Sequence, residues 1–453
     1  MSSQLSQLPV VVIGAGPVGL AAAAQLADRG LPFLVLEAGD GPAAAVREWG
    51  HVRLFSPWRY DLDPAAARLL GDAGWVRPDD DKLPTGAELA ADYLQPLADL
   101  PALKPHIRYS ARVVAVTRLG LDRVRSAGRA DTPFLVRLTD GTDLHARAVI
   151  DASGTWDTPN VLGAYGIPAH GEAGAAAYLE NALPDVLGRD RDRFAGRRVL
   201  VVGAGHSAAN TVLALAALAE QAPDTRVTWA VRSSSPTRTY GGQSADALPE
   251  RGALGTRLRQ AVESGAVTLL TGFRVERVRV DGDTVRVSDG DRTVTADRIV
   301  SATGFRPDHG ITGELRLDLD PILGSTRALA PLIDPNEHSC GTVPPHGVDE
   351  LTHPEPGYYA IGVKSYGRAP TFLLATGYEQ ARSVVAALAG DWAAARDVRL
   401  DLPETGVCSS DAVDGDSCCG TAPEESAEPL PTAPLNLITL GDSPAAGQAG
   451  TCC

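Results

Sequence analysis

Two glycine-rich segments, each placed directly after a short apolar run, constrain this chain more than any other feature. The first runs from Val10 to Gly19 and the second from Val199 to Ala209. Each predicts a buried parallel strand, a tight glycine turn and an alanine-rich helix. In such a turn, backbone N–H groups and the positive end of the helix face a diphosphate. The chain is therefore expected to bind two dinucleotides at once.

The residue at the end of the next apolar run separates the two dinucleotides. After the first turn this residue is Glu37, whose carboxylate can accept hydrogen bonds from a ribose diol and would repel a 2′-phosphate. After the second turn it is Arg232, followed by serines, which suits the additional phosphate of NADPH. We therefore expect FAD at the first site and NADPH at the second. A solvated cation at the strand end is the alternative reading of Arg232.

Length and charge narrow the class of protein. With 453 residues the chain is long enough for about three domain-sized units. No apolar run reaches the ~18 residues that a membrane helix needs, and the first residues lack the pattern of a signal peptide. A net charge of −15 disfavours nucleic acid and anionic membranes as partners. We expect a cytoplasmic protein with a small-molecule substrate, and leave open whether it forms a homodimer.

The order of the expected elements predicts an α/β fold with two Rossmann-like dinucleotide-binding domains, in which an NADPH domain interrupts the FAD domain. The predicted boundaries are 1–154 and 303–400 for the two parts of the FAD domain, 155–302 for the NADPH domain and 401–453 for a flexible acidic tail. Thr85 and Glu88 have the spacing of a capping box that opens a helix to about Asp99. Residues 47–58 are expected to form a loop over the flavin ring, with Trp49 in it.

Two similar strand endings, Asp-Ala-Ser-Gly at 151–154 and Ser-Ala-Thr-Gly at 301–304, mark where the chain leaves and re-enters the first domain. With them the sequence resembles the two-dinucleotide-binding-domain flavoproteins, and specifically the flavin-containing monooxygenases. Residues 357–382 resemble this family's closing segment, in which a glycine turn near the flavin ring leads into a helix. Related disulfide reductases usually carry aspartate after that glycine, where Val363 stands here. The family's Phe-x-Gly-x-x-x-His motif is absent, so no catalytic residue is assigned.

Turn, strand-end and closing-segment residues make up the predicted cofactor contacts. For the two cofactors together these are Gly14, Ala15, Gly16, Pro17, Gly19, Glu37, Trp49, Gly154, Gly203, Gly205, His206, Ser207, Arg232, Thr303, Gly304, Gly362 and Gln380.

Cysteine placement is the second informative pattern. None precedes Cys340, and the other five lie within the last 46 residues. Bacillithiol-disulfide reductases resemble this chain in layout but carry a cysteine where Val18 stands, so reduction through an internal dithiol is not expected. Residues 401–453 contain nine acidic residues and no Lys, Arg or His, and should be flexible.

Two adjacent cysteine pairs in that tail suit soft ions such as trivalent arsenic or mercuric ion. The predicted metalloid-capture residues are Cys408, Cys418, Cys419, Cys452 and Cys453. The alternative is a disordered tail with incidental thiols. Cys340 is either a third soft ligand or a buried thiol.

Three further segments, at 340–347, 364–372 and 402–408, are similar to the ArsO-type flavoproteins of actinobacterial arsenic-resistance operons. This resemblance implies an NADPH-dependent FAD monooxygenase that oxygenates a soft nucleophile, a trivalent arsenical, through a C4a-(hydro)peroxyflavin. Two alternatives stay open. One is a flavin-dependent reductase that passes electrons to the tail cysteines, a disulfide or a metal ion. The other is a metalloid-binding carrier in which the flavin is structural.

Overall fold

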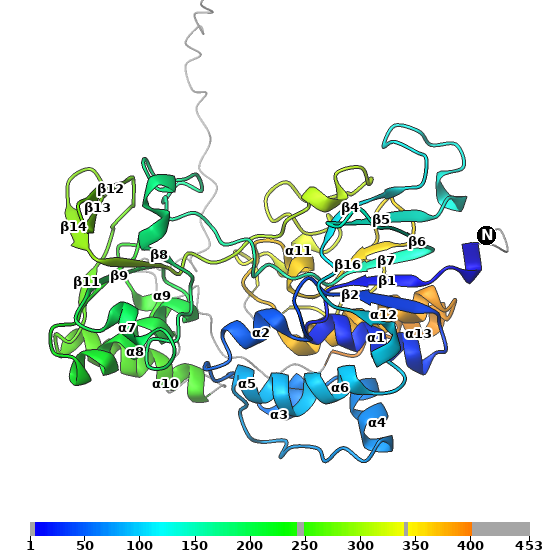
Figure 1. Cartoon of the computed structure of the whole chain (residues 1–453), viewed down its shortest axis with the longest axis horizontal. Helices are drawn as coiled ribbons and strands as arrows, with labels where there is room; N and C mark the ends of the chain where they lie inside the picture. Colours follow the sequence, from blue (N-terminus) through cyan, green and yellow to red (C-terminus); the bar gives the residue numbers. More distant parts are fainter. Residues whose placement is uncertain (1–4, 242–248, 339–342, 401–453) are drawn as a thin grey trace, which may run out of the picture. The chain divides into compact units, whose positions relative to one another are not determined.

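The computed structural model describes residues 5–241, 249–338 and 343–400 (Figure 1). All six cysteines lie outside these residues, and so do the predicted acidic tail and the five predicted metalloid-capture residues. No helix in the described part is long and apolar enough to cross a membrane.

The first sheet is parallel and has five strands in the order β16-β7-β1-β2-β3. Their bounds are β1 Val10–Ile13, β2 Phe33–Leu36, β3 Ile107–Arg108, β7 Ala148–Asp151 and β16 Tyr358–Ala360. The sequences of β1, β2 and β7 are almost wholly apolar because both faces of this sheet are covered. Ile13 is level with Asp151, so the first glycine turn lies beside the end of β7.

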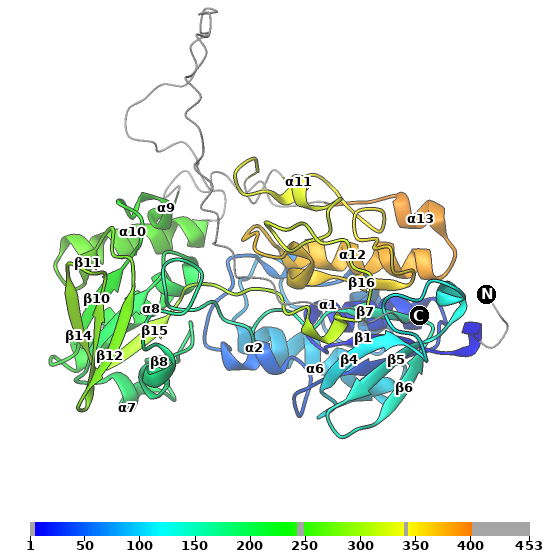
Figure 2. The same cartoon turned by 90° about the horizontal axis from the view of Figure 1, so that it is seen from above.

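Helices from opposite ends of the described chain cover this sheet. Helix α1, Pro17–Asp28, is rich in buried alanines and packs against α12, Leu374–Leu388, as Figures 1 and 2 show. Small alanine side chains let the two helix backbones approach closely. The C-terminal segment therefore closes the domain that the N-terminal segment begins.

The second sheet is also parallel, with the order β11-β10-β9-β15-β8. Its strands are β8 Leu179–Glu180, β9 Arg198–Val202, β10 Arg226–Ala230, β11 Thr268–Leu270 and β15 Arg298–Ser301. Helix α8, His206–Gln221, begins directly after the second glycine turn. Within the described chain all five strands fall between β7 and β16, so the second sheet interrupts the first.

Two three-stranded antiparallel sheets complete the strand content of the described residues. One contains β4 Val113–Arg118, β5 Phe134–Leu138 and β6 Asp143–Ala146, and the other contains β12 Arg277–Asp281, β13 Thr284–Ser288 and β14 Thr293–Ala296. The Asp-Gly turn between β12 and β13 places Gly282 at φ +60°, a conformation that glycine adopts readily.

The remaining α-helices are short, except for α10. Their bounds are α2 Ala44–Glu48, α3 Trp58–Asp61, α4 Pro64–Asp72, α5 Gly86–Glu88, α6 Gln95–Asp99, α7 Arg191–Phe194, α9 Thr237–Tyr240, α10 Pro249–Glu263, α11 Ala330–Ile333 and α13 Trp392–Arg396.

The structure confirms two of the sequence-based expectations about the fold and contradicts another. The α/β architecture with parallel Rossmann-type sheets is confirmed. The capping box is also confirmed, since the side chains of Thr85 and Glu88 each accept a backbone N–H of the other residue. The predicted loop at 47–58 is wrong at both ends, because α2 extends to Glu48 and α3 begins at Trp58. The domain boundaries stay a prediction.

Candidate functional site

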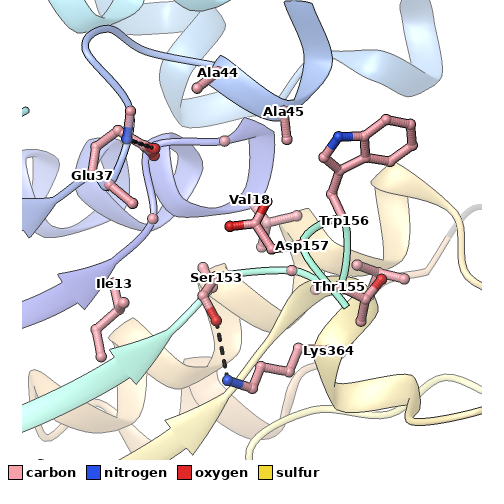
Figure 3. Close-up of a pocket in the computed structure, with 18 of the residues that line it drawn as sticks. Ile13, Val18, Glu37, Ala44, Ala45, Ser153, Thr155, Trp156, Asp157 and Lys364 are labelled. Carbon is pink, nitrogen blue, oxygen red and sulfur yellow. Dashed lines mark hydrogen bonds between the residues drawn. The ribbon is translucent and has the colours of Figure 1, made fainter. Parts of the chain in front are cut away.

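A cavity of about 450 Å³ opens at the carboxyl ends of the strands of the first sheet (Figure 3). Its wall combines the first glycine turn, the end of β2, helix α2 and the segments 152–158 and 361–364. In open α/β sheets, ligands bind at this edge, where strand ends and helix beginnings meet. We call it the first cavity.

The three glycines of the first turn differ in their surroundings. A Cβ on Gly14, whose φ is +99°, would lie 2.7 Å from the carbonyl oxygen of Ala152. A Cβ on Gly19 would lie 2.0 Å from the carbonyl oxygen of Gly14. By contrast, a Cβ on Gly16 would meet no heavy atom within 4 Å. Gly14 and Gly19 are therefore needed for packing, whereas the missing side chain of Gly16 leaves space for a ligand.

Glu37 is the buried carboxylate of the first cavity. Its Oε2 accepts the N–H of Ala15 at 2.6 Å and its Oε1 accepts the N–H of Gly39 at 2.8 Å. Each carboxylate oxygen has two lone pairs, so both can still accept a hydroxyl donor. The geometry thus fits the ribose diol that the sequence predicts at this position.

The predicted FAD residues divide by position. Those that line the first cavity are Gly14, Gly16, Pro17, Glu37, Trp49, Gly154 and Gly362. Ala15, Gly19 and Gln380 lie outside its wall. The side chain of Gln380 is fully buried, and its Oε1 accepts the N–H of Gly362 at 2.8 Å. Gln380 therefore supports the glycine turn from behind rather than facing the cavity.

Sequence reasoning missed a buried ion pair at the first cavity. The Nζ of Lys364 lies 2.6 Å from the Oδ2 of Asp151. It also lies 3.1 Å from the Oγ of Ser153 (Figure 3). The hydroxyl of Tyr358 donates to the same Asp151 oxygen at 3.1 Å. Burial alone would raise the pKa of Asp151, but the Lys364 ammonium and the hydrogen bonds hold it below its usual value. The chain has only three lysines, so a lysine within an apolar closing segment was the available signal.

A second cavity of about 490 Å³ lies at the carboxyl ends of the second sheet. Gly203 has φ +142°, and a Cβ there would lie 2.0 Å from the carbonyl oxygen of Ala302. A Cβ on Gly205 would meet no heavy atom within 4 Å. In the second turn, as in the first, one glycine is needed for packing and a later glycine leaves space for a ligand.

Several of the predicted cofactor contacts gather around the second cavity. Those that line it are Gly203, Gly205, Ser207, Arg232, Thr303 and Gly304. His206 begins α8 and is not part of this wall. Its ring meets that of Phe55 edge to face, with centroids 5.1 Å apart.

The charge of the second cavity is one-sided. Its described wall contains Arg232, Arg306 and Arg368 and no acidic residue. Asn160 holds part of the rim, because its Oδ1 accepts the Nε of Arg306 at 2.7 Å and its Nδ2 donates to the carbonyl of Thr303 at 3.0 Å. Guanidinium groups pair well with phosphates, so the wall suits a nucleotide that carries a phosphate beyond its diphosphate.

Two Rossmann-type sheets, each with a glycine turn below a cavity, define a flavoprotein that also binds a nicotinamide nucleotide. The chain belongs to the pyridine nucleotide-disulphide oxidoreductase family, whose model matches residues 11–326. It is a flavin-dependent oxidoreductase, and its cofactors are FAD and NADPH.

Individual relatives differ in the reaction that they are named for. Indole-3-pyruvate monooxygenase YUCCA1 of Oryza sativa subsp. japonica is 32% identical over 199 residues, which cover 44% of this chain and 42% of that protein. Ferredoxin–NADP reductase 1 of Cupriavidus metallidurans is 27% identical over 325 residues, which cover 70% of this chain and 76% of that protein. Bacillithiol disulfide reductase Bdr from Bacillus cereus has a TM-score of 0.62 at 19% identity, covering 84% and 99% of the two chains. This last likeness shows the fold alone.

Proposed function

We propose that the protein is an NADPH-dependent FAD monooxygenase that oxygenates a soft nucleophile, with a trivalent arsenical as the substrate. FAD occupies the first cavity and NADPH the second. When bound, FAD supplies the redox chemistry, taking hydride from NADPH and activating oxygen. The reaction balances as NADPH, a proton, oxygen and the arsenic lone pair giving NADP⁺, water and an arsenic–oxygen bond.

The observation that carries the proposal is the side chain at position 18. Val18 lines the first cavity, and a Cβ on Gly362 would lie 3.4 Å from its Cβ. No cysteine is present among the described residues of this wall. A reductase that works through an internal dithiol needs thiols next to the flavin. Without them, electrons from this cavity need an acceptor from outside its described wall, and oxygen is the acceptor that we propose.

The protein's own residues bind, orient and exclude water. Apolar side chains of Val18, Ile311, Phe372 and Leu374 line part of the first cavity. These side chains limit the access of bulk water to the cavity, which would suppress side reactions with water. Gln380 fixes the Gly362 turn by accepting its N–H at 2.8 Å.

The choice of an arsenical rests on the sequence. The ArsO-type resemblance and the adjacent cysteines at 418–419 and 452–453 favour a thiophilic substrate. A lone pair on trivalent arsenic is a soft nucleophile, as an electrophilic oxygen donor requires. We assign capture of the arsenical to the tail cysteines. The name of the relative YUCCA1 supports the monooxygenase class.

The test is NADPH oxidation by the holoenzyme under air and under argon, with arsenite and a methylated trivalent arsenical as substrates. We expect oxidation that the arsenical stimulates, that requires oxygen, and that uses one NADPH per arsenic oxidised. Label from ¹⁸O₂ should enter the product. Serine at positions 418, 419, 452 and 453 should raise the KM for the arsenical without changing FAD content. Arsenical binding without NADPH consumption would instead establish a carrier.

A reductase is the second candidate, because the ferredoxin–NADP reductase relative covers a larger share of this chain than YUCCA1 does. In that case electrons from NADPH would leave to an external acceptor. The argon arm of the same experiment decides between the two. Stoichiometric anaerobic reduction of a disulfide, mercuric ion or a one-electron acceptor protein, with no stimulation by arsenicals in air, would establish the reductase.

A further inference from the structure

Lys364 is the buried cation of the first cavity, and its role there is open. Lys364 lines the cavity, and its side chain is only 2% exposed. Asp151 and Ser153 accept two of its three N–H donors, at 2.6 and 3.1 Å. The third donor is left for a further acceptor.

The position of this cluster follows from the first glycine turn. Asp151 ends β7 level with Ile13, the residue before Gly14. A Cβ on Gly14 would lie 3.2 Å from the Cα of Ser153, the residue whose hydroxyl accepts Lys364. The ammonium is therefore one hydrogen bond away from a residue packed against the turn, and the turn is where a diphosphate approaches the backbone.

The charges of the cavity wall make this cation important. Its described wall contains four acidic residues, namely Glu37, Glu48, Asp157 and Asp308, and two cations, Arg112 and Lys364. Arg112 is exposed and pairs with Asp157 at 3.1 Å. Lys364 is thus the one buried positive side chain in the described wall, and it shares its charge with Asp151.

We propose that Lys364 is the cation that binds the diphosphate of FAD, and that Asp151 and Ser153 hold its ammonium in position. The proposal rests on the assignment of FAD to the first cavity but not on the identity of the oxygenated substrate. Burial of the Asp151 carboxylate costs desolvation free energy, and a cation must pair with it to offset that cost. The competing explanation is that Lys364 only neutralises Asp151 and never contacts the cofactor.

The test compares four proteins: the wild type, Lys364→Met, Asp151→Asn/Lys364→Met and Lys104→Met. Lys104 is the matched control, since it pairs with Asp99 at 2.9 Å in the same way but is 68% exposed. FAD affinity is measured by adding FAD back to protein from which it has been removed. Two competitors are compared, ADP, which has a diphosphate, and adenosine, which has none. We expect Lys364→Met to weaken FAD binding by about 10- to 100-fold. The preference for ADP over adenosine should fall by about the same factor, and Lys104→Met should bind like the wild type.

The double variant separates the two explanations, because it leaves no unpaired buried charge that could disturb the fold. Weak FAD binding and a lost ADP preference in the double variant would support the contact with the diphosphate. Wild-type affinity in the double variant would overturn the proposal. Gly16→Leu serves as a reference for the cavity itself. If Gly16→Leu loses FAD while both Lys364 variants keep it, the inference fails and the cavity assignment stands. If Gly16→Leu also keeps FAD, the cavity assignment fails.

Discussion

The two cavities share a backbone design and differ in charge. In both, the first glycine of the turn packs against a carbonyl oxygen, of Ala152 or of Ala302, and a later glycine faces open space. The described wall of the first cavity carries four acidic residues. That of the second carries three arginines and no acidic residue. The strand–turn–helix unit thus provides a place for a diphosphate, and side chains at the strand ends select which nucleotide occupies it.

Blocking each cavity in turn tests this comparison with the largest expected effect. Gly16→Leu and Gly205→Leu both add a side chain where no heavy atom lies within 4 Å, so the fold should survive. We expect Gly16→Leu to lose FAD, measured as the flavin absorbance per chain. Gly205→Leu should keep FAD but lose reduction by NADPH, with kcat/KM down by about 100-fold or more, since backbone contacts to the diphosphate are blocked. Loss of FAD from both variants would show that the two cavities are not independent.

The carboxyl group of Asp61 is buried in the protein core. Asp61, at the end of α3, is 1% exposed, and the hydroxyl of Ser56 donates to its Oδ1 at 2.7 Å. Burial raises the pKa of Asp61 from 3.8 to about 7, so the folded protein holds a proton that the unfolded chain releases.

The contribution of this proton to stability is complete below pH 3.8 and is lost as the pH rises through about 7. Unfolding measured by circular dichroism at pH 5 and pH 8 should therefore show a loss of about 1 to 3 kcal/mol from this group. Asp61→Asn cannot titrate and should remove that part of the pH dependence. An unchanged slope in the variant would show that Asp61 is ionised in the fold at neutral pH.

Removing the strand-end cation of the second cavity should have a smaller effect. Arg232 is exposed and lines this cavity, where a charge-assisted contact to a 2′-phosphate is worth about 1.5 to 3 kcal/mol. We expect Arg232→Ala to lower the preference for NADPH over NADH by about tenfold or more, measured as the ratio of kcat/KM values. Arg226→Ala, at the start of the same strand, is the control and should leave the ratio unchanged. Equal ratios in both variants would make Arg232 a solvated strand-end cation.

The sequence predicted those parts of the two cavities that depend on neighbouring residues in the chain. Gly14, Gly203 and Glu37 each follow a strand directly, and Arg232 lies two residues beyond β10, so local pattern was enough. The short helices α2 and α3 escaped it, because helices of four or five residues have too few turns to show a period.

Contacts between distant segments could not be predicted in this way. Lys364 and Asp151 are 213 residues apart, and their meeting depends on β16 pairing with β7 in one register. Gln380 was predicted as a cofactor contact, but its side chain lies behind the Gly362 turn, because the face of α12 that carries it depends on tertiary packing. The cysteine pattern concerns residues outside the described chain and stays a prediction.

The smallest predicted effect concerns the amide side chains that support each rim. Gln380 accepts the N–H of Gly362 at 2.8 Å beside the first cavity, and Asn160 donates to the carbonyl of Thr303 at 3.0 Å beside the second. Each of these is a neutral hydrogen bond, worth about 0.5 to 1.5 kcal/mol. Gln380→Leu should therefore weaken FAD binding by roughly 2- to 10-fold with no change in the KM for NADPH. Asn160→Leu should do the reverse, because it also releases Arg306, whose Nε donates to it at 2.7 Å. FAD titration and steady-state kinetics on both variants measure the two effects separately. If either variant changed FAD affinity and the KM for NADPH equally, the two rims would act as one structural unit. The two cavities would then not be independent of each other.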